Sequence, residues 1–419
     1  MSASAISLIV ACVILFAVDI YVLSGLQTLI KHPVFRHRVR NGYIIFSVIM
    51  LTLLFIAIYV KLNAFGLRAL VLLIFFLLLT AKVFFLPFIV TDDIRRGFIF
   101  LKRKIRGAPI EQPKNEGENS PPKITRSEFL MKAGLISASL PLVSLSYGII
   151  SGAYDYRIRR QKLVLKNLPK AFDGLKLAQV SDIHSGSFYN KTAVNGGIDM
   201  LLGEKPDMIF FTGDLVNNMT SEVRDYQSTF ARLKAPLGVY STLGNHDYGD
   251  YHAWPSRAAK EQNLRDIVTV HKQMGYDLLM NENRRIKIDG EEIGVLGIEN
   301  WGALSRFPRY GKMDLAVKNT GDLPVKLLLS HDPSHWRAQV LPQYPQIDAM
   351  FSGHTHGMQF GVRFEHFQWS PIQYVYKEWA GLYHEKDQQL YVNTGYGFLG
   401  YPGRVGILPE ITIFELKQG

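Results

Sequence analysis

The chain contains very little cysteine. Cys12 is the only cysteine among 419 residues, and it lies in an apolar stretch near the N-terminus. A fold held together by disulfide bonds is therefore excluded. Charged residues are also few, at 20% of the chain, whereas 47% of the residues are hydrophobic. This balance excludes intrinsic disorder for the chain as a whole, and the length allows two or three domains with sizeable cores.

Acidic residues are too few to balance the basic residues, so the formal net charge is +11. A charge of this size would suit a nucleic-acid partner if it covered a folded domain. Instead, residues 1–154 contain 17 lysines and arginines against 7 acidic residues, whereas residues 155–419 contain 30 against 29. Almost all of the excess charge lies in the more apolar part of the chain. We therefore expect no nucleic-acid partner, and we expect membrane lipid to be a partner of the first part.

Four apolar runs in this first part are long enough to cross a bilayer, which takes about 20 residues. They predict transmembrane helices at residues 5–24, 43–60, 69–90 and 133–154. A helix buried in a soluble domain is the alternative, and it is strongest for the fourth run, which contains Pro141 and several serines. The first run is not preceded by the basic residues of a signal peptide, so we expect an uncleaved helix.

Basic residues between the runs predict the topology. Four of them lie between the first and second runs and ten lie between the third and fourth. Because basic loops stay in the cytoplasm, the N-terminus and residues 155–419 are expected outside. Residues 91–132 then form a cytoplasmic polar linker, and their proline-rich part, 108–123, has a linker's composition. The membrane region is therefore expected to span residues 1–154, followed by one further domain at 155–419.

Six basic residues that follow the fourth run disagree with this topology, because they would lie on the wrong side. They are Arg157, Arg159, Arg160, Lys162, Lys166 and Lys170. If the fourth run does not cross the membrane, residues 155–419 lie in the cytosol instead.

Two charged residues interrupt the apolar runs. Asp19 lies in the first run and Lys82 in the third, and the expected topology places both in the cytoplasmic half of the bilayer at similar depth. Charged groups inside membrane spans are costly and are usually paired or functional, so we predict that the two side chains form an ion pair. The alternative is that each extends to the nearer interface.

Residues 155–419 are typical of an α/β domain, in which short apolar runs alternate with polar segments. Five of these runs end at a cluster of Asp, His or Asn. The runs are 177–180, 208–211, 239–242, 326–329 and 349–351. The clusters that follow them are Asp182-Ile183-His184, Gly213-Asp214, Gly244-Asn245-His246-Asp247, Ser330-His331-Asp332 and Gly353-His354-Thr355-His356-Gly357. Because ligands of α/β sheets bind at the carboxyl ends of strands, we expect the clusters to meet at one place.

The residue types in these clusters indicate divalent metal ions. Aspartate, histidine and asparagine without a thiolate suit borderline ions such as Zn, Mn, Fe or Ni. Seven such ligands are too many for one ion, but they suit two ions that share one bridging carboxylate. Two metals close together can stabilise both the attacking and the leaving oxygen of a displacement at phosphorus.

In this order the clusters resemble the pattern of the calcineurin-like metallophosphoesterase superfamily: D-x-H, G-D, G-N-H-[D/E], H and G-H-x-H. The resemblance covers about residues 170–416. The C-terminal segment from Asn393 to Gly397, followed by Arg404 and residues 408–412, is similar to the membrane-attached bacterial branch related to YkuE and YaeI, and to transmembrane metallophosphoesterase-domain proteins. The implied fold is a four-layer α/β sandwich with two mixed β-sheets in the middle, and the implied location is the bacterial inner (plasma) membrane.

The resemblance also implies roles for individual residues. The first metal would be bound by Asp182, His184 and His356. The second would be bound by Asn245, His331 and His354, and Asp214 would bridge the two ions. A hydroxide bridging the ions would attack phosphorus, His246 would protonate the leaving oxygen, and Asp247 would orient His246. Arg404 and Tyr248 are further candidates for substrate contact, and a structural ion pair is the alternative for Arg404.

The resemblance therefore predicts a membrane-attached phosphoesterase that uses two divalent metals. The expected substrate is a phosphodiester, a pyrophosphate or a monoester, and the position near the membrane makes an envelope or lipid-linked phosphoester a candidate. One alternative is an inactive binding or scaffold protein that keeps the fold, and another is a nucleotide phosphodiesterase facing the cytosol. One departure concerns export: residues 125–132 resemble a twin-arginine signal, but Ser127 stands where the second arginine is expected. The aromatic stretch at 364–376 is interpreted either as a loop near the membrane or as core.

Overall fold

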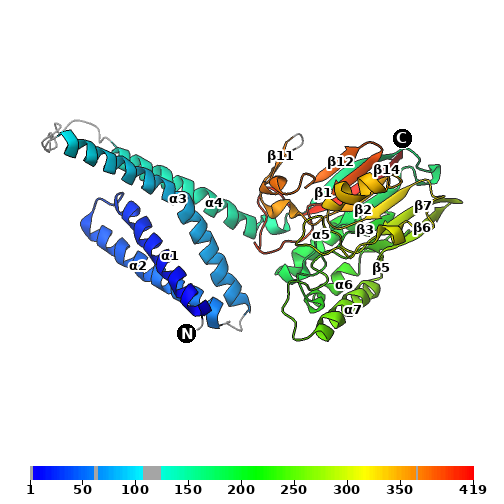
Figure 1. The fold of residues 1–419 in the computed structure, drawn as a ribbon, viewed down its shortest axis with the longest axis horizontal. Helices are drawn as coiled ribbons and strands as arrows, with labels where there is room; N and C mark the ends of the chain where they lie inside the picture. Colours follow the sequence, from blue (N-terminus) through cyan, green and yellow to red (C-terminus); the bar gives the residue numbers. More distant parts are fainter. Residues whose placement is uncertain (1–2, 61–64, 107–123, 365–366) are drawn as a thin grey trace. The chain divides into compact units, whose positions relative to one another are not determined.

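The computed structural model describes residues 3–60, 65–106, 124–364 and 367–419. The proline-rich segment 108–123 lies outside these residues. The chain divides into two compact units, Met1–Ser146 and Tyr147–Gly419. The first unit contains long helices, whereas the second contains two β-sheets and their covering helices (Figure 1).

Among the described residues, four helices are long and apolar enough to cross a membrane. They are α1 (Ala3–Gln27), α2 (Pro33–Phe55), α3 (Phe65–Arg106) and α4 (Arg126–Ile150), and a π-helical turn, η1 (Ile56–Val60), continues α2. Most of their exposed side chains are apolar, as contact with lipid requires. The protein is therefore an integral membrane protein.

The helices extend beyond the apolar runs that predicted them. Residues 91–106, expected in the linker, form the last turns of α3, and α2 begins at Pro33, a residue whose fixed φ suits the first turn of a helix. Hydropathy marks only the residues that meet hydrocarbon, whereas helical hydrogen bonding continues into polar sequence. With 42 residues, α3 is roughly 60 Å long, about twice the thickness of the hydrocarbon core.

Asp19 and Lys82 form the predicted ion pair. The Asp19 side chain is buried, and the Tyr43 hydroxyl donates a hydrogen bond to it at 3.4 Å. The pair therefore joins α1 and α3, with α2 held to the same carboxylate. A cavity of about 370 Å³ lies beside these groups and is otherwise lined mainly by apolar side chains.

A second polar junction joins α4 to α3. The buried Asp92 carboxylate accepts hydrogen bonds from Arg95 at 2.6 Å and from the Ser127 hydroxyl at 2.9 Å. Ser127 is the residue that departs from the twin-arginine pattern. Its side chain instead connects the first turn of α4 to a buried carboxylate of α3.

The second unit contains two six-stranded mixed β-sheets. The first has the order β1-β14-β2-β3-β4-β5, with β2 to β5 parallel and β14 antiparallel to β2. Its strands are β1 (Arg157–Leu165), β2 (Lys176–Val180), β3 (Met208–Phe211), β4 (Val239–Ser241), β5 (Asp277–Leu278) and β14 (Glu410–Gln418). The second has the order β12-β13-β9-β8-β7-β6, with β13, β9, β8 and β7 parallel. Its strands are β6 (Glu282–Ile288), β7 (Glu291–Gly297), β8 (Lys326–Leu329), β9 (Ala349–Ser352), β12 (Gly381–Glu385) and β13 (Gln388–Val392).

Helices cover the outer faces of both sheets. The first sheet is covered by α5 (Lys191–Gly203), α6 (Gln227–Phe230) and α7 (Arg257–Met274), as Figure 1 shows. The second sheet is covered by α8 (Met313–Ala316), the π-helical turn η6 (Trp336–Val340) and α9 (Leu341–Gln343). A small hairpin of β10 (Val362–Arg363) and β11 (Gln368–Trp369) is separate from both sheets.

Alternating apolar residues build the layers. Along β3, Met208 and Phe210 point into the core between the sheets, whereas Ile209 and Phe211 point into the core beneath α5 and α7. This alternation is the two-residue period of a strand that is buried on both faces. The four-layer sandwich with two mixed sheets is therefore confirmed.

The Asp19–Lys82 pair gives a first test. Asp19→Lys or Lys82→Asp alone should lower the yield of folded protein, because an unpaired charge inside a span costs about 3 kcal/mol. The double exchange should restore the yield, measured by fluorescence-detected size-exclusion chromatography of the tagged full-length chain. Lys104→Asp, at an exposed position of α3, is the control and should change little. Failure of the double exchange to rescue either single variant would refute the pairing as a determinant of folding.

Candidate metal centre

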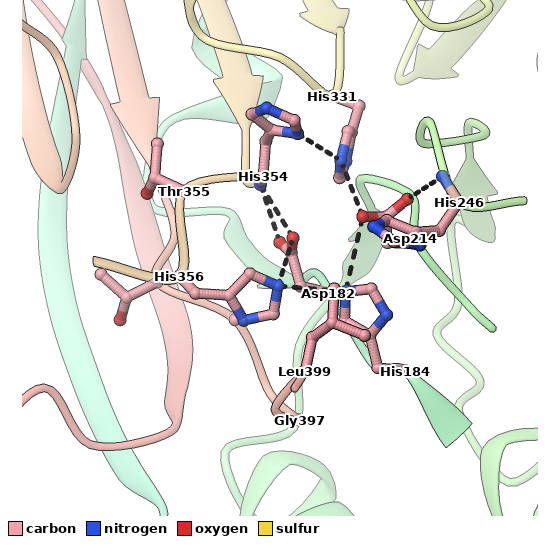
Figure 2. Close-up of polar contacts among 12 residues, drawn as sticks. Asp182, His184, Asp214, His246, His331, His354, Thr355, His356, Gly397 and Leu399 are labelled. Atoms are coloured by element: carbon pink, nitrogen blue, oxygen red, sulfur yellow. Dashed lines mark hydrogen bonds and ion pairs between the residues drawn. The ribbon is translucent and has the colours of Figure 1, made fainter. Parts of the chain in front are cut away.

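The sheet topology brings the five clusters to one place. Strands β2, β3 and β4 are parallel neighbours in the first sheet, and β8 and β9 are parallel neighbours in the second. Their carboxyl ends therefore lie at one end of the sandwich. Figure 2 shows the side chains of Asp182, His184, Asp214, His331, His354 and His356 pointing toward one another from these strand ends.

Within this cluster, two groups of three side chains could each hold a metal ion. One group is Asp182, His184 and His356, and the other is Asp214, His331 and His354. Each group offers three ligand atoms that lie within 4.8 Å of one another. The Asp214 Oδ2 atom faces both groups, at 3.1 Å from His331 Nε2 and 3.4 Å from His184 Nε2. This is the position that a bridging carboxylate needs.

The backbone at these residues is in a rarely occupied conformation. Five residues of the two groups have positive φ angles, between 48° and 72°. They are Asp182, His184, Asp214, His354 and His356. Left-handed backbone at such residues costs about 1–3 kcal/mol each and persists only where the surroundings enforce it. The strain is typical of a functional site, because it turns the side chains of successive loops inward.

Two glycines allow the loops to approach one another. A Cβ atom at Gly353 would collide with the Asp182 carboxylate, and one at Gly244 would collide with the Asp214 carboxylate. Both carboxylates are also fixed by backbone amides. The His354 N–H donates to both oxygens of Asp182, at 2.9 and 3.0 Å, and the His246 N–H donates to Asp214 Oδ1 at 2.9 Å.

The donor atoms fit divalent cations. The Asn245 side-chain amide donates to the Tyr251 hydroxyl at 3.0 Å, whereas its Oδ1 atom is buried and has no hydrogen-bond partner among the residues that the structure describes. The ring nitrogens His184 Nε2 and His356 Nε2 lie 3.0 Å apart, although the two histidines come from different loops. Lone pairs that converge in this way, and an unpartnered buried oxygen, suit a cation that is bound by nitrogen and oxygen ligands.

Burial and charge adjust the protonation of the same groups. Burial lowers the pKa of His184 and His354, which keeps both rings neutral, as metal ligands must be. Burial alone would also lower the pKa of His331, but the Asp214 carboxylate raises it to about 10. Conversely, the charge of His331 holds the pKa of Asp214 well below its usual value despite burial. Without a metal, a proton on His331 therefore balances Asp214.

His246 lies at the edge of the same pocket and is half-buried. Its Nδ1 atom donates to the Asn217 carbonyl oxygen at 2.6 Å, because a carbonyl can only accept. Asp247 has a different position from the one expected. Its carboxylate accepts hydrogen bonds from the backbone N–H groups of Asp214, Leu215, Val216 and Gly244, at 2.8 to 3.3 Å. Asp247 thus fixes the loop of Asp214, and the Asn217 carbonyl orients the His246 ring.

The two residues expected to contact substrate are not brought to the pocket. Arg404 is fully buried, donates to the carbonyls of Thr394 and Gly397, and lies 3.3 Å from His356 Nδ1, on the side away from the other ligands. Tyr248 is buried, and its hydroxyl is bonded to Glu299 and to the Asn300 N–H. Neither side chain is accessible to a substrate.

The pocket beside the two groups has a volume of about 330 Å³. Besides the expected residues Asp214, Asn245, His246, His354 and His356, it is lined by Tyr251, Arg306, Phe307, Thr355, Ile372, Tyr376 and Leu399. Arg306 is exposed, and the Tyr376 hydroxyl is 2.8 Å from His354 Nε2. Sequence reasoning placed neither residue in the site, because Arg306 lies in a long loop without a motif and Tyr376 ends the aromatic stretch that was interpreted as a membrane loop or as core. Tyr251 follows the Gly244–Asp247 cluster closely, and its position there was the only available signal.

Comparison with known proteins agrees with this fold and site. Residues 4–153 match a family model described as a probable calcineurin-like phosphoesterase, transmembrane domain, and residues 175–358 match the model of the calcineurin-like phosphoesterases. A transmembrane protein with metallophosphoesterase domain from Danio rerio is 29% identical over 283 residues, which cover 65% of this chain and 60% of that protein. The uncharacterized metallophosphoesterase YkuE of Bacillus subtilis is 29% identical over 304 residues, 71% of this chain and 99% of YkuE.

Among solved structures, the NAD nucleotidase of Haemophilus influenzae matches with a TM-score of 0.36 and 15% identity, over 53% of this chain and 45% of that one. The two family models together account for the helical unit and for the strand ends that carry the His and Asp groups. The chain therefore belongs to the calcineurin-like metallophosphoesterases that have a transmembrane domain.

Proposed function

We propose that this protein hydrolyses a phosphoester, most readily a phosphodiester, with two divalent metal ions in a domain attached to the membrane. One ion is held by Asp182, His184 and His356. The other is held by Asn245, His331 and His354, and Asp214 is shared. The observation that carries the proposal is the position of Asp214 Oδ2, within 3.4 Å of histidines from both groups.

The chain's own residues have defined tasks in this reaction. When bound, the two ions supply Lewis acidity at the phosphoryl oxygens and make water nucleophilic near neutral pH. Because His246 Nδ1 is engaged by the Asn217 carbonyl, its Nε2 atom is the one available to protonate the leaving oxygen. Arg306 replaces Arg404 as the arginine that binds the phosphate, since it is exposed at the pocket.

The walls of the pocket favour a substrate with an apolar part beside the phosphate. Phe307, Ile372 and Leu399 line it together with Arg306. We therefore propose an envelope or lipid-linked phosphoester, and Mn, Fe, Zn or Ni as the ions. A pyrophosphate and a phosphomonoester are the alternative substrates, because the same two-metal chemistry would hydrolyse them. An inactive scaffold is disfavoured, because no residue of the expected ligand set is replaced in this chain.

The catalytic domain is proposed to lie outside the cytoplasm of a bacterial inner membrane. Basic residues govern topology mainly in short loops, whereas long domains are translocated regardless of charge. Of the six basic residues that disagreed, Arg157, Arg159 and Arg160 belong to β1 of the folded domain. They pair with Asp155, Glu410 and Glu204, so the fold itself accounts for them. A cytosolic nucleotide phosphodiesterase is the alternative if α4 does not cross.

Metal analysis and turnover together test the proposed function. Asp214→Asn should lose both ions, whereas His246→Gln should keep both and lose roughly 100- to 10,000-fold in turnover. The measurements are elemental analysis of the purified full-length protein and hydrolysis of a generic diester and a generic monoester, after reloading with each candidate ion. His384→Gln, an exposed histidine outside the site, is the control. Turnover of His246→Gln at the control's rate would refute the acid role, and a metal-loaded protein without turnover would refute the function.

The role of Asp247 as a positioning residue gives another test. The Asp247 carboxylate accepts from four backbone N–H groups, whereas in Asp247→Asn one of the two oxygens is replaced by an NH₂ that cannot accept. Each N–H group that loses its acceptor costs about 1–3 kcal/mol. The thermal midpoint should fall by roughly 5–10 °C, and metal content should fall with it. Asp250→Asn, which removes the charge from a partly exposed ion pair with Lys260, should shift the midpoint far less. Equal shifts in the two variants would contradict the positioning role.

The side of the domain can be measured with single cysteines in a Cys12→Ser background. A membrane-impermeant maleimide should label Leu315→Cys in intact spheroplasts, because Leu315 is exposed in the catalytic unit. Lys102→Cys, in the polar end of α3, should be labelled only after lysis. The opposite pattern would place the catalytic domain in the cytosol.

A further inference from the structure

The exposed apolar side chains of the second unit are concentrated in one short segment. Among the described residues from Tyr147 to Gly419, fifteen large apolar or aromatic side chains are exposed, and seven of them lie between Met358 and Val375. They are Met358, Phe360, Val362, Phe364, Phe367, Tyr374 and Val375, and we refer to them as the apolar rim. Contiguous exposure of this kind marks a surface that contacts a partner or a membrane.

Hydrogen bonds hold the backbone of the apolar rim. Strands β10 and β11 pair through Val362 with Trp369, and the Phe364 N–H donates to the Phe367 carbonyl at 2.8 Å. The next element, the 3₁₀ turn η8 (Pro371–Tyr374), is fixed by Ser370, whose hydroxyl donates to the Gly357 carbonyl at 2.8 Å. The described aromatic side chains are therefore exposed on hydrogen-bonded backbone.

Within the second unit, backbone contacts connect the apolar rim to residues 147–150, which form the last turn of α4. The Gly148 carbonyl in the last turn of α4 accepts from the Arg404 N–H at 3.1 Å. The next residue, Val405, pairs with Phe360, and the Gly361 N–H donates to its carbonyl at 2.9 Å. Strand β10 begins at the following residue, Val362. Thus one short chain of hydrogen bonds leads from α4 to the rim.

The end of α4 marks the level of the membrane surface. The apolar run of α4 begins after Lys132, and about 20 residues cross the hydrocarbon core, so the run ends near Gly152. Tyr147 and Ile150 are exposed there, and the exposed Tyr189 donates to the Ile149 carbonyl at 2.7 Å. Tyrosines are enriched at this depth because the ring is apolar and the hydroxyl is polar.

Charge next to the rim suits phospholipid. A recess of about 590 Å³ lies between the hairpin, β1 and β12, and its described lining contains three arginines and no acidic residue. They are Arg159, Arg160 and Arg363. Arg160 pairs with Glu204, whereas Arg159 and Arg363 share one buried carboxylate, Glu410, so that one positive charge remains in excess. Exposed aromatic side chains beside excess positive charge complement an anionic membrane surface.

We propose that the apolar rim lies in the interfacial layer of the bilayer that α4 crosses, with the arginine recess facing anionic headgroups. The occupant of this surface is phospholipid, and the described residues of the aromatic stretch, Phe364 and 367–376, belong to the membrane-contacting surface. The same segment carries Ile372, which lines the metal pocket, beside the exposed Tyr374. If the proposed function holds, this surface also brings the pocket's mouth to membrane-held phosphoesters, but the contact itself does not depend on catalysis.

A depth measurement on the full-length protein tests the contact. In the Cys12→Ser background, Phe367→Cys carries an environment-sensitive fluorophore in nanodiscs of equal parts phosphatidylcholine and phosphatidylglycerol. Lipids with a nitroxide high on the acyl chain should remove roughly half of the emission, since interfacial side chains reach this depth. Leu315→Cys, equally labelled and exposed outside the rim, is the matched control and should keep its emission.

If Phe367→Cys lowers the thermal midpoint below that of the Cys12→Ser protein, the same quenching measurement is made on Val375→Cys, which lies outside the hairpin. Emission at the rim that is unquenched and water-like would overturn the proposal. A change that follows protein concentration in detergent rather than lipid would also overturn it, because it would assign the rim to a second copy of the chain. Equal quenching without phosphatidylglycerol would overturn the role of the arginine recess.

Discussion

The carboxylate of Asp214 is the constraint on which the site depends. It is buried at the end of β3 and faces histidines that come from both sheets. Such a charge is stable only if its neighbours compensate it, as the charge of His331 and the His246 N–H do here. Asp247 fixes the surrounding backbone, because it accepts hydrogen bonds from four backbone N–H groups, among them those of Asp214 and Gly244. One carboxylate thus fixes the backbone that presents another. Two consecutive motifs, Gly213-Asp214 and Gly244–Asp247, are therefore hydrogen-bonded to each other in the fold, although each is weak as a sequence signal.

The same arrangement explains why the strained backbone occurs where it does. Left-handed φ angles at Asp182, Asp214 and His354 direct three loops toward one centre, and glycines at 244 and 353 remove the Cβ atoms that would keep the loops apart. The sandwich core between the sheets, with Phe210 and Phe351 in contact, supplies the rigidity against which this strain is held. Stability is therefore concentrated in the sheets, whereas the loops at their ends are shaped for ligands.

The sequence was sufficient to identify residues whose chemistry is local to a motif. Strand ends followed by Asp, His and Asn predicted that these side chains meet at one place, since parallel strands place their carboxyl ends together, and the family resemblance implied their division between two metals. It was insufficient where geometry depends on partners far along the chain. Arg404 is separated from its neighbour His356 by 48 residues, and only the fold shows that it is buried behind that ring. Hydropathy likewise located the spans but could not show that α3 continues for sixteen residues beyond Val90.

Arg404 also shows how the first residues of the second unit are joined to the site. A fully buried guanidinium is costly, and here it is compensated by backbone carbonyls and by the nearby charge of Asp182, with burial lowering its pKa to about 10. Its side chain lies against His356, while its backbone N–H is bonded to Gly148 in the last turn of α4. Gly152 leaves no room for a Cβ atom against the Arg404 carbonyl. Within the second unit, Gly148 and Gly152 are therefore packed directly on the residue behind a proposed metal ligand, so the backbone there and the His356 ring depend on the same buried arginine.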